Sequence, residues 1–279
     1  MVWRHSCRIL NFLQQDLDYS CKTRELLSEH AEWSTVCSIY FSNLLEDKGM
    51  SLSDTTQLVM NVLAGKPSVC DDVASCEVLQ HAAAFTFLRD EVVVNKKPLT
   101  PELASEAHRM LMAGMVREDG LVVRAGSYRD SLVNAGFYLF PPPGCIEAAV
   151  KDLLEAYNTR AASGKEDPFV LAAWLSMEYV SIHPFEDGNG RMCRLLLSIA
   201  LLSNGVPFCS ALGFSSGHRR AKSHYMQCIK NARSQHGDMA QRLAFVVLCS
   251  FRDCAVAFLM ALSISAPELK LPMDAHGRP

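Results

Sequence analysis

The sequence lacks several features that would point to particular classes of protein. It contains no Cys-x-x-Cys pair, although it has 11 cysteines, and its net charge is only −3, from 27 basic and 30 acidic residues. Because basic and acidic residues are nearly equal in number, the charge gives no sign of a nucleic-acid-binding surface or a polybasic membrane anchor. Most of the cysteines fall in apolar, helix-like stretches, where a free thiol packs as a small hydrophobic group. We therefore expect a reducing compartment rather than a disulfide framework.

Long uninterrupted apolar runs are also scarce. The N-terminal region holds no apolar stretch long enough for a signal peptide. The apolar stretch 254–266 is too short to cross a bilayer and follows Arg252 and Asp253, so we expect a core helix there, no membrane segment and a cytoplasmic protein. Hydrophobic residues make up 49% of the chain and charged residues 20%. That composition is typical of a packed globular protein and excludes a wholly disordered chain.

The apolar periodicity predicts helix after helix along most of the chain. Thr100 is an N-cap residue followed by a first-turn proline and a first-turn acid, and Asp167 is likewise followed by proline. Residues 132–143 depart from this pattern, because they combine aromatic and branched side chains with Gly136 and closing prolines. A short hairpin and a plain surface loop both fit that segment. The fold class predicted is all-α.

One segment carries most of the chemistry, the sequence HPFEDGNGRMCR at residues 183–194. Pro184 disfavours helix at the residue before it, so a helix should end at His183 and present the imidazole at its mouth. The Gly-Asn-Gly run 188–190 leads into a new helix, whose free N–H groups can bind phosphate. Asp187 offers an oxygen ligand for Mg²⁺ beside them, and Glu186 is expected to face outward.

Two arginines complete this motif. Arg191 and Arg194 lie three residues apart on the new helix, so both side chains can reach the same side. Two guanidinium groups beside a phosphate cradle suit a polyphosphate better than a single carboxylate. The set as a whole indicates phosphoryl or nucleotidyl transfer, in which catalysis is mostly positioning and charge stabilisation. A glycine-rich helix start with surface arginines would explain any one of these residues, but not all of them together.

The motif resembles the signature of the Fic family, HxFx(D/E)GNGRxxR, at every fixed position, and the similarity extends from about residue 39 to residue 245. The resemblance implies a Fic-type helical bundle with one short β-hairpin flap, and transfer of AMP from ATP to a hydroxyl side chain of a target protein. His183 would be the general base, and Asp187 would hold Mg²⁺ against the phosphates. The residues that would bind the ATP phosphates are Asp187, Gly188, Asn189, Gly190, Arg191 and Arg194.

The resemblance also covers a segment that precedes the flap. Gly126 and Arg129 match the family's Gly-x-x-Arg segment, and we expect both to be mainly structural. The flap residues that would lie nearest the nucleotide and dock the target are Ala135, Gly136, Phe137 and Tyr138. Plain hydrophobic cover is the alternative for the two aromatic side chains. Tyr225 and Asn231 fall where relatives contact the adenosine, although the spacing there slips by one residue.

A second motif lies upstream, at Ser42 and Glu46. Taken alone, acidic residues at a helix end before Gly49 indicate a solvated helix terminus. The resemblance implies more, because autoinhibited Fic proteins carry (S/T)xxxE(G/N) on a helix that packs on the active site. There the glutamate pairs with the second motif arginine and blocks the γ-phosphate. Asp47 departs from the Gly or Asn expected at its position. Dimer contacts often tune such brakes in the family, so a homodimer is among the expected assemblies.

These observations divide the chain into an N-terminal helical extension (1–27), an inhibitory-helix region (28–66), a catalytic domain (67–266) and a loose tail (267–279). Three functions stay open. The first is a protein adenylyltransferase with ATP as co-substrate and Mg²⁺ as cofactor. The second is a hydrolase that removes AMP from modified proteins, with Glu46 aligning the water, either alone or beside transfer. The third is a nucleotide-binding interaction protein whose brake never releases.

Overall fold

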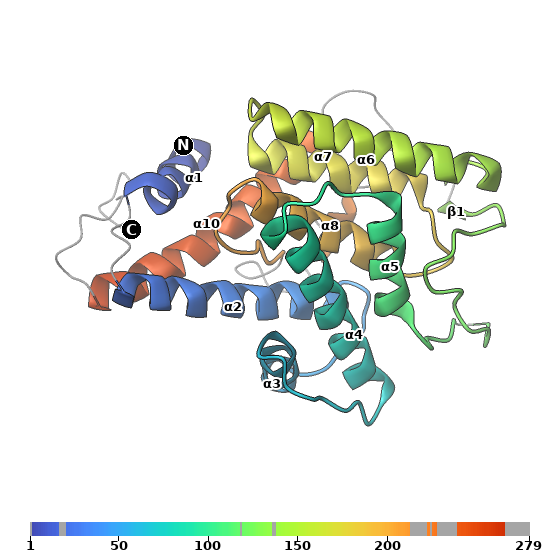
Figure 1. Ribbon diagram of the computed structural model, residues 1–279, viewed down its shortest axis with the longest axis horizontal. Coiled ribbons are helices and arrows are strands. Elements are labelled where there is room, and N and C mark those ends of the chain that lie inside the picture. Colours follow the sequence, from blue (N-terminus) through green and yellow to red (C-terminus); the bar gives the residue numbers. More distant parts are fainter. Residues whose placement is uncertain are drawn as a thin grey trace.

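The structure is a computed structural model that describes residues 2–16, 21–117, 119–135, 138–212, 222–223, 225–227 and 239–265. Its α-helices (Figure 1) are α1 (Val2–Asn11), α2 (Cys21–Leu44), α3 (Leu52–Leu63), α4 (Val73–Leu88), α5 (Pro101–Met112), α6 (Ile146–Ser163), α7 (Pro168–Ile182), α8 (Asn189–Ser203) and α10 (Met239–Ser265). Short π-helical turns, η1 (Phe12–Asp16) and η2 (Arg89–Val94), continue α1 and α4, and the 3-10 turn η3 (Pro143–Cys145) precedes α6.

The sheet content of the described ranges is one antiparallel hairpin, β1 (Asn134–Ala135) and β2 (Tyr138–Leu139). The prediction of an all-α fold with one short hairpin is therefore confirmed. The tail expected at residues 267–279 lies outside the described residues.

The core is built around α7 and α8, which pack on each other near the centre of the molecule (Figure 1). α7 is apolar over nearly all of its surface, with Glu178 exposed, and is covered by α6, α8 and α10, because a helix without a polar face must be buried. Most of α8 is buried too, including its two arginines. The short loop between these two helices, residues 183–188, is therefore held between two largely buried helices. That loop contains the first half of the motif.

The predicted helix starts are confirmed in detail. Thr100 caps α5 by accepting a hydrogen bond from the Leu103 N–H at 3.3 Å, and Asp167 caps α7 by accepting from the Phe169 N–H at 2.9 Å. Nearer the N-terminus, α2 begins at Cys21 and continues to Leu44. The domain boundary expected at residue 28 therefore falls inside a continuous helix.

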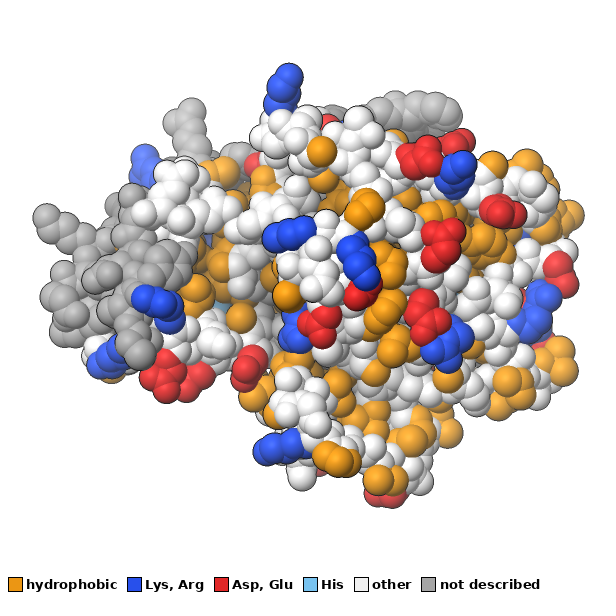
Figure 2. All heavy atoms as spheres, viewed as in Figure 1, with side chains coloured by type: hydrophobic (Ala, Val, Ile, Leu, Met, Phe, Trp, Pro, Cys, Tyr) orange, Lys and Arg blue, Asp and Glu red, His pale blue; other side chains and the backbone are white. Residues whose placement is uncertain are grey.

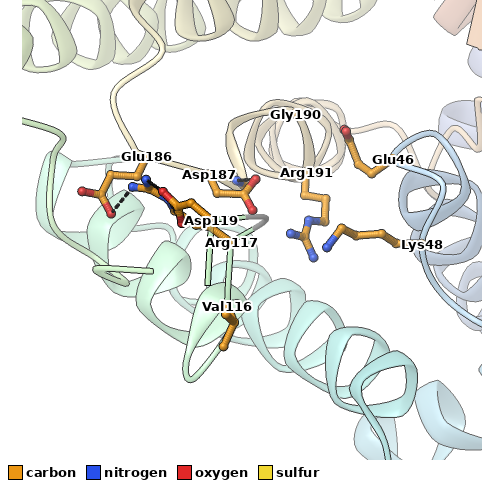
Figure 3. A pocket seen from close by; sticks show the side chains of 10 residues that line it. Glu46, Lys48, Val116, Arg117, Asp119, Glu186, Asp187, Gly190 and Arg191 are labelled. Atoms are coloured by element: carbon orange, nitrogen blue, oxygen red, sulfur yellow. Dashed lines mark hydrogen bonds and ion pairs between the residues drawn. The ribbon is translucent and has the colours of Figure 1, made fainter. Parts of the chain in front are cut away.

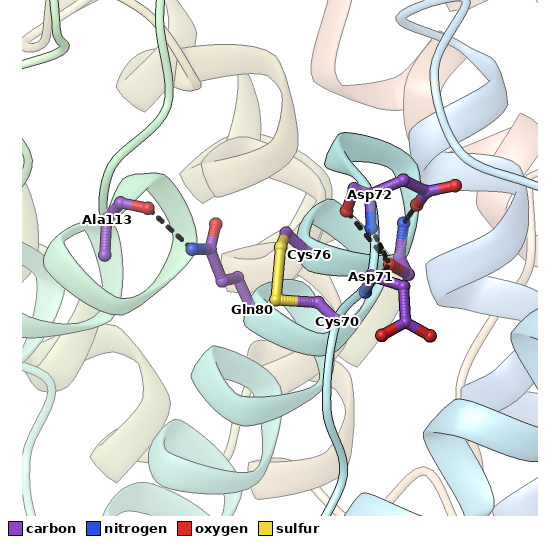
Figure 4. Close-up of a disulfide and its surroundings, with 7 residues drawn as sticks. Cys70, Asp71, Asp72, Cys76, Gln80 and Ala113 are labelled. Atoms are coloured by element: carbon purple, nitrogen blue, oxygen red, sulfur yellow. Dashed lines mark hydrogen bonds between the residues drawn. A yellow bond between two sulfur atoms is a disulfide. The ribbon is translucent and has the colours of Figure 1, made fainter.

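The N-terminus of α4 is closed by a disulfide between Cys70 and Cys76 (Figure 4). Asp72 accepts a hydrogen bond from the Ser75 N–H at 2.7 Å, and Ser75 Oγ accepts one from the Asp72 N–H at 3.1 Å. This capping box turns the chain back along the first helical turn and leaves the two cysteine Cα atoms 4.9 Å apart. The expectation of free thiols is wrong for this pair, although seven other cysteines are free among those described.

In helix α10, the apolar segment is longer than the stretch 254–266 that the sequence analysis considered. This segment, Gln241–Ser265, has 25 residues, and its most apolar 18-residue window has a mean hydropathy of 2.0, so it is long and apolar enough to cross a membrane, alone in this respect among the described helices. Of its most apolar window, 56% is buried inside the molecule, where α10 packs on α1, α2 and α7. A core helix passes the same test of length and composition, so the signal is weak evidence for a membrane span.

On the face drawn in Figure 2, basic and acidic side chains are interspersed.

Candidate active site

His183 lies where the sequence predicts, directly after the last residue of α7. Its backbone is left-handed, with φ 51° and ψ 60°, a conformation that few residues other than glycine adopt. The imidazole stacks on the ring of Phe140, just beyond β2, with centroids 4.1 Å apart and an angle of 26° between the planes. The candidate base is thus held between the end of α7 and the flap.

Arg129 fixes the backbone beneath His183. Its buried guanidinium donates hydrogen bonds to the carbonyl oxygens of His183 at 2.7 Å, Pro141 at 2.7 Å, Ser131 at 2.7 Å and Ile182 at 3.3 Å. One side chain therefore ties α7, the motif loop and the flap together. Three residues earlier, Gly126 has φ +81°, and an added Cβ would lie 3.0 Å from the Ser105 carbonyl. The structural role expected for both residues is confirmed.

The loop that leads into α8 is braced by its own side chains. Asn189 accepts a hydrogen bond from the Phe185 N–H at 3.0 Å and donates one to the Phe185 carbonyl at 2.8 Å. Its amide therefore holds the loop, and only its backbone can contribute to a phosphate cradle. Gly188 has φ +75°, and a Cβ there would come within 2.7 Å of the Met112 sulfur. Asp187 Oδ1 accepts from the Gly188 N–H at 2.6 Å.

His108 on α5 supports this loop and was not anticipated from the sequence. Its ring stacks on Phe185, with centroids 3.6 Å apart and planes 3° from parallel. Nδ1 accepts the Gly126 N–H at 2.9 Å, so the hydrogen must be on Nε2, which donates to the Asp187 carbonyl at 3.0 Å. Burial lowers the pKa of His108 to about 4, so the ring is neutral at pH 7. A lone histidine inside an amphipathic helix gives no sequence signal of this role.

Arg194 is held by the end of α2, as the upstream motif predicts. Its Nε donates to Ser42 Oγ at 2.9 Å, and its Nη2 donates to the Ser42 carbonyl at 2.9 Å and to Glu46 Oε1 at 2.5 Å. The Arg194 side chain is 5% exposed, and that of Glu46 is 36% exposed. Burial acts to raise the pKa of Glu46, but the charge and hydrogen bond of Arg194 and the charge of Arg191 outweigh it. The pKa lies below its ordinary value, and the carboxylate is ionised at neutral pH.

The turn that carries Glu46 explains the departure at the next residue. Asp47 has φ 57°, in the left-handed region. Gly, Asn and Asp are the residues that adopt this conformation most easily, so Asp47 preserves the turn that a Gly or Asn would form. Its carboxylate also pairs with Lys222 at 2.5 Å.

A pocket of about 520 Å³ opens beside this turn (Figure 3). It is lined by Glu46, Lys48, Val116, Arg117, Asp119, Glu186, Asp187, Gly188, Gly190 and Arg191. The pocket therefore brings together Asp187, the start of α8 and Arg191, as the motif predicts. The two arginines differ from the expectation of a common side, because Arg194 turns onto α2 while Arg191 lies within 3.4 Å of Glu77 on α4. Lys48, Arg117 and Asp119 were not anticipated from the sequence.

The two adjacent carboxylates of the motif have different environments. Glu186 does not face outward as expected, because Arg124 holds its Oε1 at 2.7 Å. Both carboxylates line the pocket, but Asp187 lies beside Gly188 at the start of α8. No group of three or more His, Cys, Asp or Glu side chains that could hold a metal occurs in the described ranges. A single carboxylate still fits Mg²⁺, which often binds through one or two carboxylates together with the phosphates of a nucleotide.

The weaker candidates are only partly within the described residues. Ala135 and Tyr138 pair across the hairpin, whereas Gly136, Phe137 and Asn231 lie outside the described residues. Tyr225 is buried, with its ring centroid 5.5 Å from the Arg194 guanidinium carbon, and burial raises its pKa to about 12. It therefore lies beside the second motif arginine, and its contact with adenosine stays a prediction.

Comparison with known sequences points to one family. The profile of the Fic/DOC family matches residues 98–201. A Fido domain-containing protein of Dictyostelium discoideum is 45% identical over 89 residues, which are 32% of this chain and 62% of that protein. The protein adenylyltransferase Fic of Nematostella vectensis is 29% identical over 247 residues, 85% of this chain and 52% of that protein. The chain thus spans about half the length of this adenylyltransferase.

Solved structures share the fold. A Fic domain-containing signaling protein of Bacteroides thetaiotaomicron superposes with a TM-score of 0.68 at 23% identity, covering 93% of this chain and 95% of that one. Fic-1 of C. elegans gives a TM-score of 0.70 at 20% identity, and the match covers 95% of this chain and 74% of that one. The family profile at residues 98–201, the sequence relatives and the common fold agree, and all of them are similarities to Fic proteins.

Proposed function

We propose that this chain is a protein adenylyltransferase, which transfers AMP from ATP to a hydroxyl side chain of a target protein and is held inactive by Glu46. The observation that supports this most is the pocket at the start of α8. It combines the Asp187 carboxylate, the backbone of Gly188 and Gly190 and the Arg191 guanidinium. Backbone N–H groups at a helix start, a carboxylate for a metal and a fixed cation are what a polyphosphate requires.

The residues have separate tasks in the proposed reaction. The target hydroxyl attacks the α-phosphorus of ATP, its proton passes to the imidazole of His183, and pyrophosphate leaves, so that AMP stays esterified to the target. Asp187 would hold Mg²⁺, which when bound neutralises phosphate charge. Arg129 positions His183 through its carbonyl, and His108 positions Asp187 in the same way.

Glu46 would inhibit the site in two ways, through its negative charge and by accepting a hydrogen bond from Arg194. Glu46 and Ser42 together accept three hydrogen bonds from Arg194, which removes this guanidinium as a phosphate ligand. The ionised Glu46 carboxylate also places a negative charge where a γ-phosphate would approach Arg194. ATP could then bind only in a pose unfit for in-line attack.

Autoradiography with α-labelled ATP tests both parts of the proposal. Glu46→Gly should raise self-labelling strongly over the parent, and Glu46→Gly combined with His183→Ala should cancel the gain. The matched control is Asp47→Gly, which removes one acid from the same turn at a position whose left-handed backbone suits glycine. It should stay near the parent, because the pair between Glu46 and Arg194 is intact. A Glu46→Gly protein no more active than the parent, with nucleotide binding unchanged, would refute the brake but not the transfer.

A second candidate is hydrolytic removal of AMP from a modified protein. The observation that favours it is that Glu46 is ionised and lines the same pocket, where a carboxylate can orient a water molecule. The two activities predict opposite effects of one change. Glu46→Gly should abolish release of AMP from a pre-modified target, whereas it should raise transfer. A protein that binds ATP and shows neither activity in either form would instead be a nucleotide-binding interaction protein.

A further inference from the structure

We infer that Lys48 is an additional ligand for the terminal phosphate of the bound nucleotide, acting from a cluster with Glu77 and Arg191. The inference rests on the nucleotide site proposed above and assigns it a residue outside both sequence motifs. Lys48 lies in the turn after α2, two residues beyond Glu46, and lines the pocket. Figure 3 shows its amine directed toward the Arg191 guanidinium.

The cluster carries more positive than negative charge. Oε1 of Glu77 accepts a hydrogen bond from Lys48 Nζ at 2.9 Å and lies 3.4 Å from Arg191 Nη1. A single carboxylate, only 4% exposed, is therefore shared by two cations. Two cations and one carboxylate give the three side chains a formal net charge of +1. That excess faces the pocket, where it favours an anion.

Arg191 adds a second, independent sign of a missing ligand. Its side chain is 2% exposed, yet its Nε has no hydrogen-bond partner in the described part of the chain. Among the described residues, its Nη2 meets only the sulfur of Met112, at 3.2 Å, a weak acceptor. A buried guanidinium with unsatisfied donors is costly, and an anionic oxygen in the pocket would remove that cost.

Lys48 can move to contact such an anion, whereas Arg194 is held in place. Its side chain is 38% exposed, and its flexible four-carbon stem can carry the ammonium group from Glu77 to a ligand in the same pocket. Arg194, in contrast, is enclosed by Ser42 and Glu46. A terminal phosphate can therefore reach Lys48 before Glu46 has moved. Lys48 would then make the pocket prefer nucleoside triphosphates to diphosphates.

Nucleotide titration of the full chain tests this. Dissociation constants for MgATP and MgADP are measured by calorimetry for the parent, Lys48→Met and Glu77→Gln. Lys151→Met is the charge-matched control, because Lys151 is on α6, 63% exposed and outside the pocket lining. Thermal unfolding confirms that each variant is folded. The same set is repeated with Glu46→Gly present, so that the brake cannot mask an effect.

Lys48→Met should raise the Kd for ATP about tenfold, the loss of one charge-assisted contact, and should change the Kd for ADP much less. Glu77→Gln should bind ATP at least as tightly as the parent, since both cations are then released to the ligand. The inference is overturned if ATP binding by Lys48→Met stays close to that of Lys151→Met, or if ADP loses as much as ATP. It is also overturned if Glu77→Gln weakens binding as Lys48→Met does, because the pair would then be structural. A parent that binds no ATP would refute the proposed function itself, whereas binding without AMP transfer leaves this inference standing.

Discussion

Replacing Arg129 by methionine should destabilise the fold and inactivate the site together. The guanidinium donates four hydrogen bonds to backbone carbonyls and is 2% exposed. Methionine fills a similar volume but donates nothing, so carbonyls of α7, the motif loop and the flap would lose their common donor. The change tests whether this single side chain holds His183 in place.

The magnitude follows from the contacts. Each hydrogen bond to a charged group contributes about 1.5–3 kcal/mol, so the four of Arg129 set an upper limit of about 6–12 kcal/mol. The desolvation of the buried guanidinium offsets several kcal/mol of this, and carbonyls near the surface would regain water. We expect Arg129→Met to lower the free energy of unfolding by about 3–5 kcal/mol. For a chain of this size that corresponds to a fall in Tm of roughly 6–20 °C.

Urea denaturation followed by circular dichroism measures this loss. Arg129→Lys should recover only a small part of it, because an ammonium group cannot bridge three segments. The control is Arg109→Met, which removes an arginine that is 57% exposed and paired with Glu106 one turn away, and should cost about 0.5 kcal/mol or less. If Arg129→Met loses less than about 1 kcal/mol, comparable to an ordinary surface substitution, the argument that it braces the site is refuted.

Three further predictions concern the site. His183→Ala should abolish AMP transfer while ATP still binds, because the pocket cations and the α8 start remain; transfer within tenfold of the parent would contradict its role as base. Asp187→Ala should remove the Mg²⁺ dependence of nucleotide binding measured by calorimetry, while Glu186→Ala, which loses a pair with Arg124, should keep it; equal behaviour would show that the metal is misplaced. Burial lowers the pKa of His81 to about 3 and of His108 to about 4, so the unfolded state, with pKa values near 6.5, binds more protons as the pH falls. The free energy of unfolding should therefore drop below pH 6.5, by about 1.4 kcal/mol per pH unit for each histidine, and less steeply in His108→Gln; an unchanged slope would contradict the neutral buried ring.

Local chemistry made part of this site predictable from the sequence. Pro184 fixes the end of α7, so the placement of His183 in the chain needs no knowledge of the rest of the fold. The caps Thr100 and Asp167 act within one helical turn and were equally readable. The pairing of Arg194 with Glu46 became predictable only through the family resemblance, because 148 residues separate the two side chains.

Long-range partners account for what the sequence did not predict. The spacing of Arg191 and Arg194 allows a common side, but Glu77 on another helix decides where Arg191 lies. Glu186 looked solvent-facing because its partner Arg124 is 62 residues away. The bond between Cys70 and Cys76 depends on how a helix cap turns the preceding chain. None of these partners is marked by periodicity or by a short motif.

If Glu46 inhibits the site as proposed, the enclosure of Arg194 by Ser42 and Glu46 means that activity depends on the populations of a closed and an open state. Glu46 is partly exposed, so its pair with Arg194 has a modest net free energy, about 1.4 kcal/mol, which leaves roughly one molecule in ten with the Glu46 carboxylate turned away from the arginine. The apparent Kd for a correctly placed triphosphate is then the intrinsic Kd divided by that fraction. A partner that contacts the turn after α2 and shifts this balance by a further 1.4 kcal/mol toward closure would lower the open fraction about tenfold. In the proposed reaction, a small change in free energy at one exposed turn would thus set the fraction of molecules that can transfer AMP at a given ATP concentration.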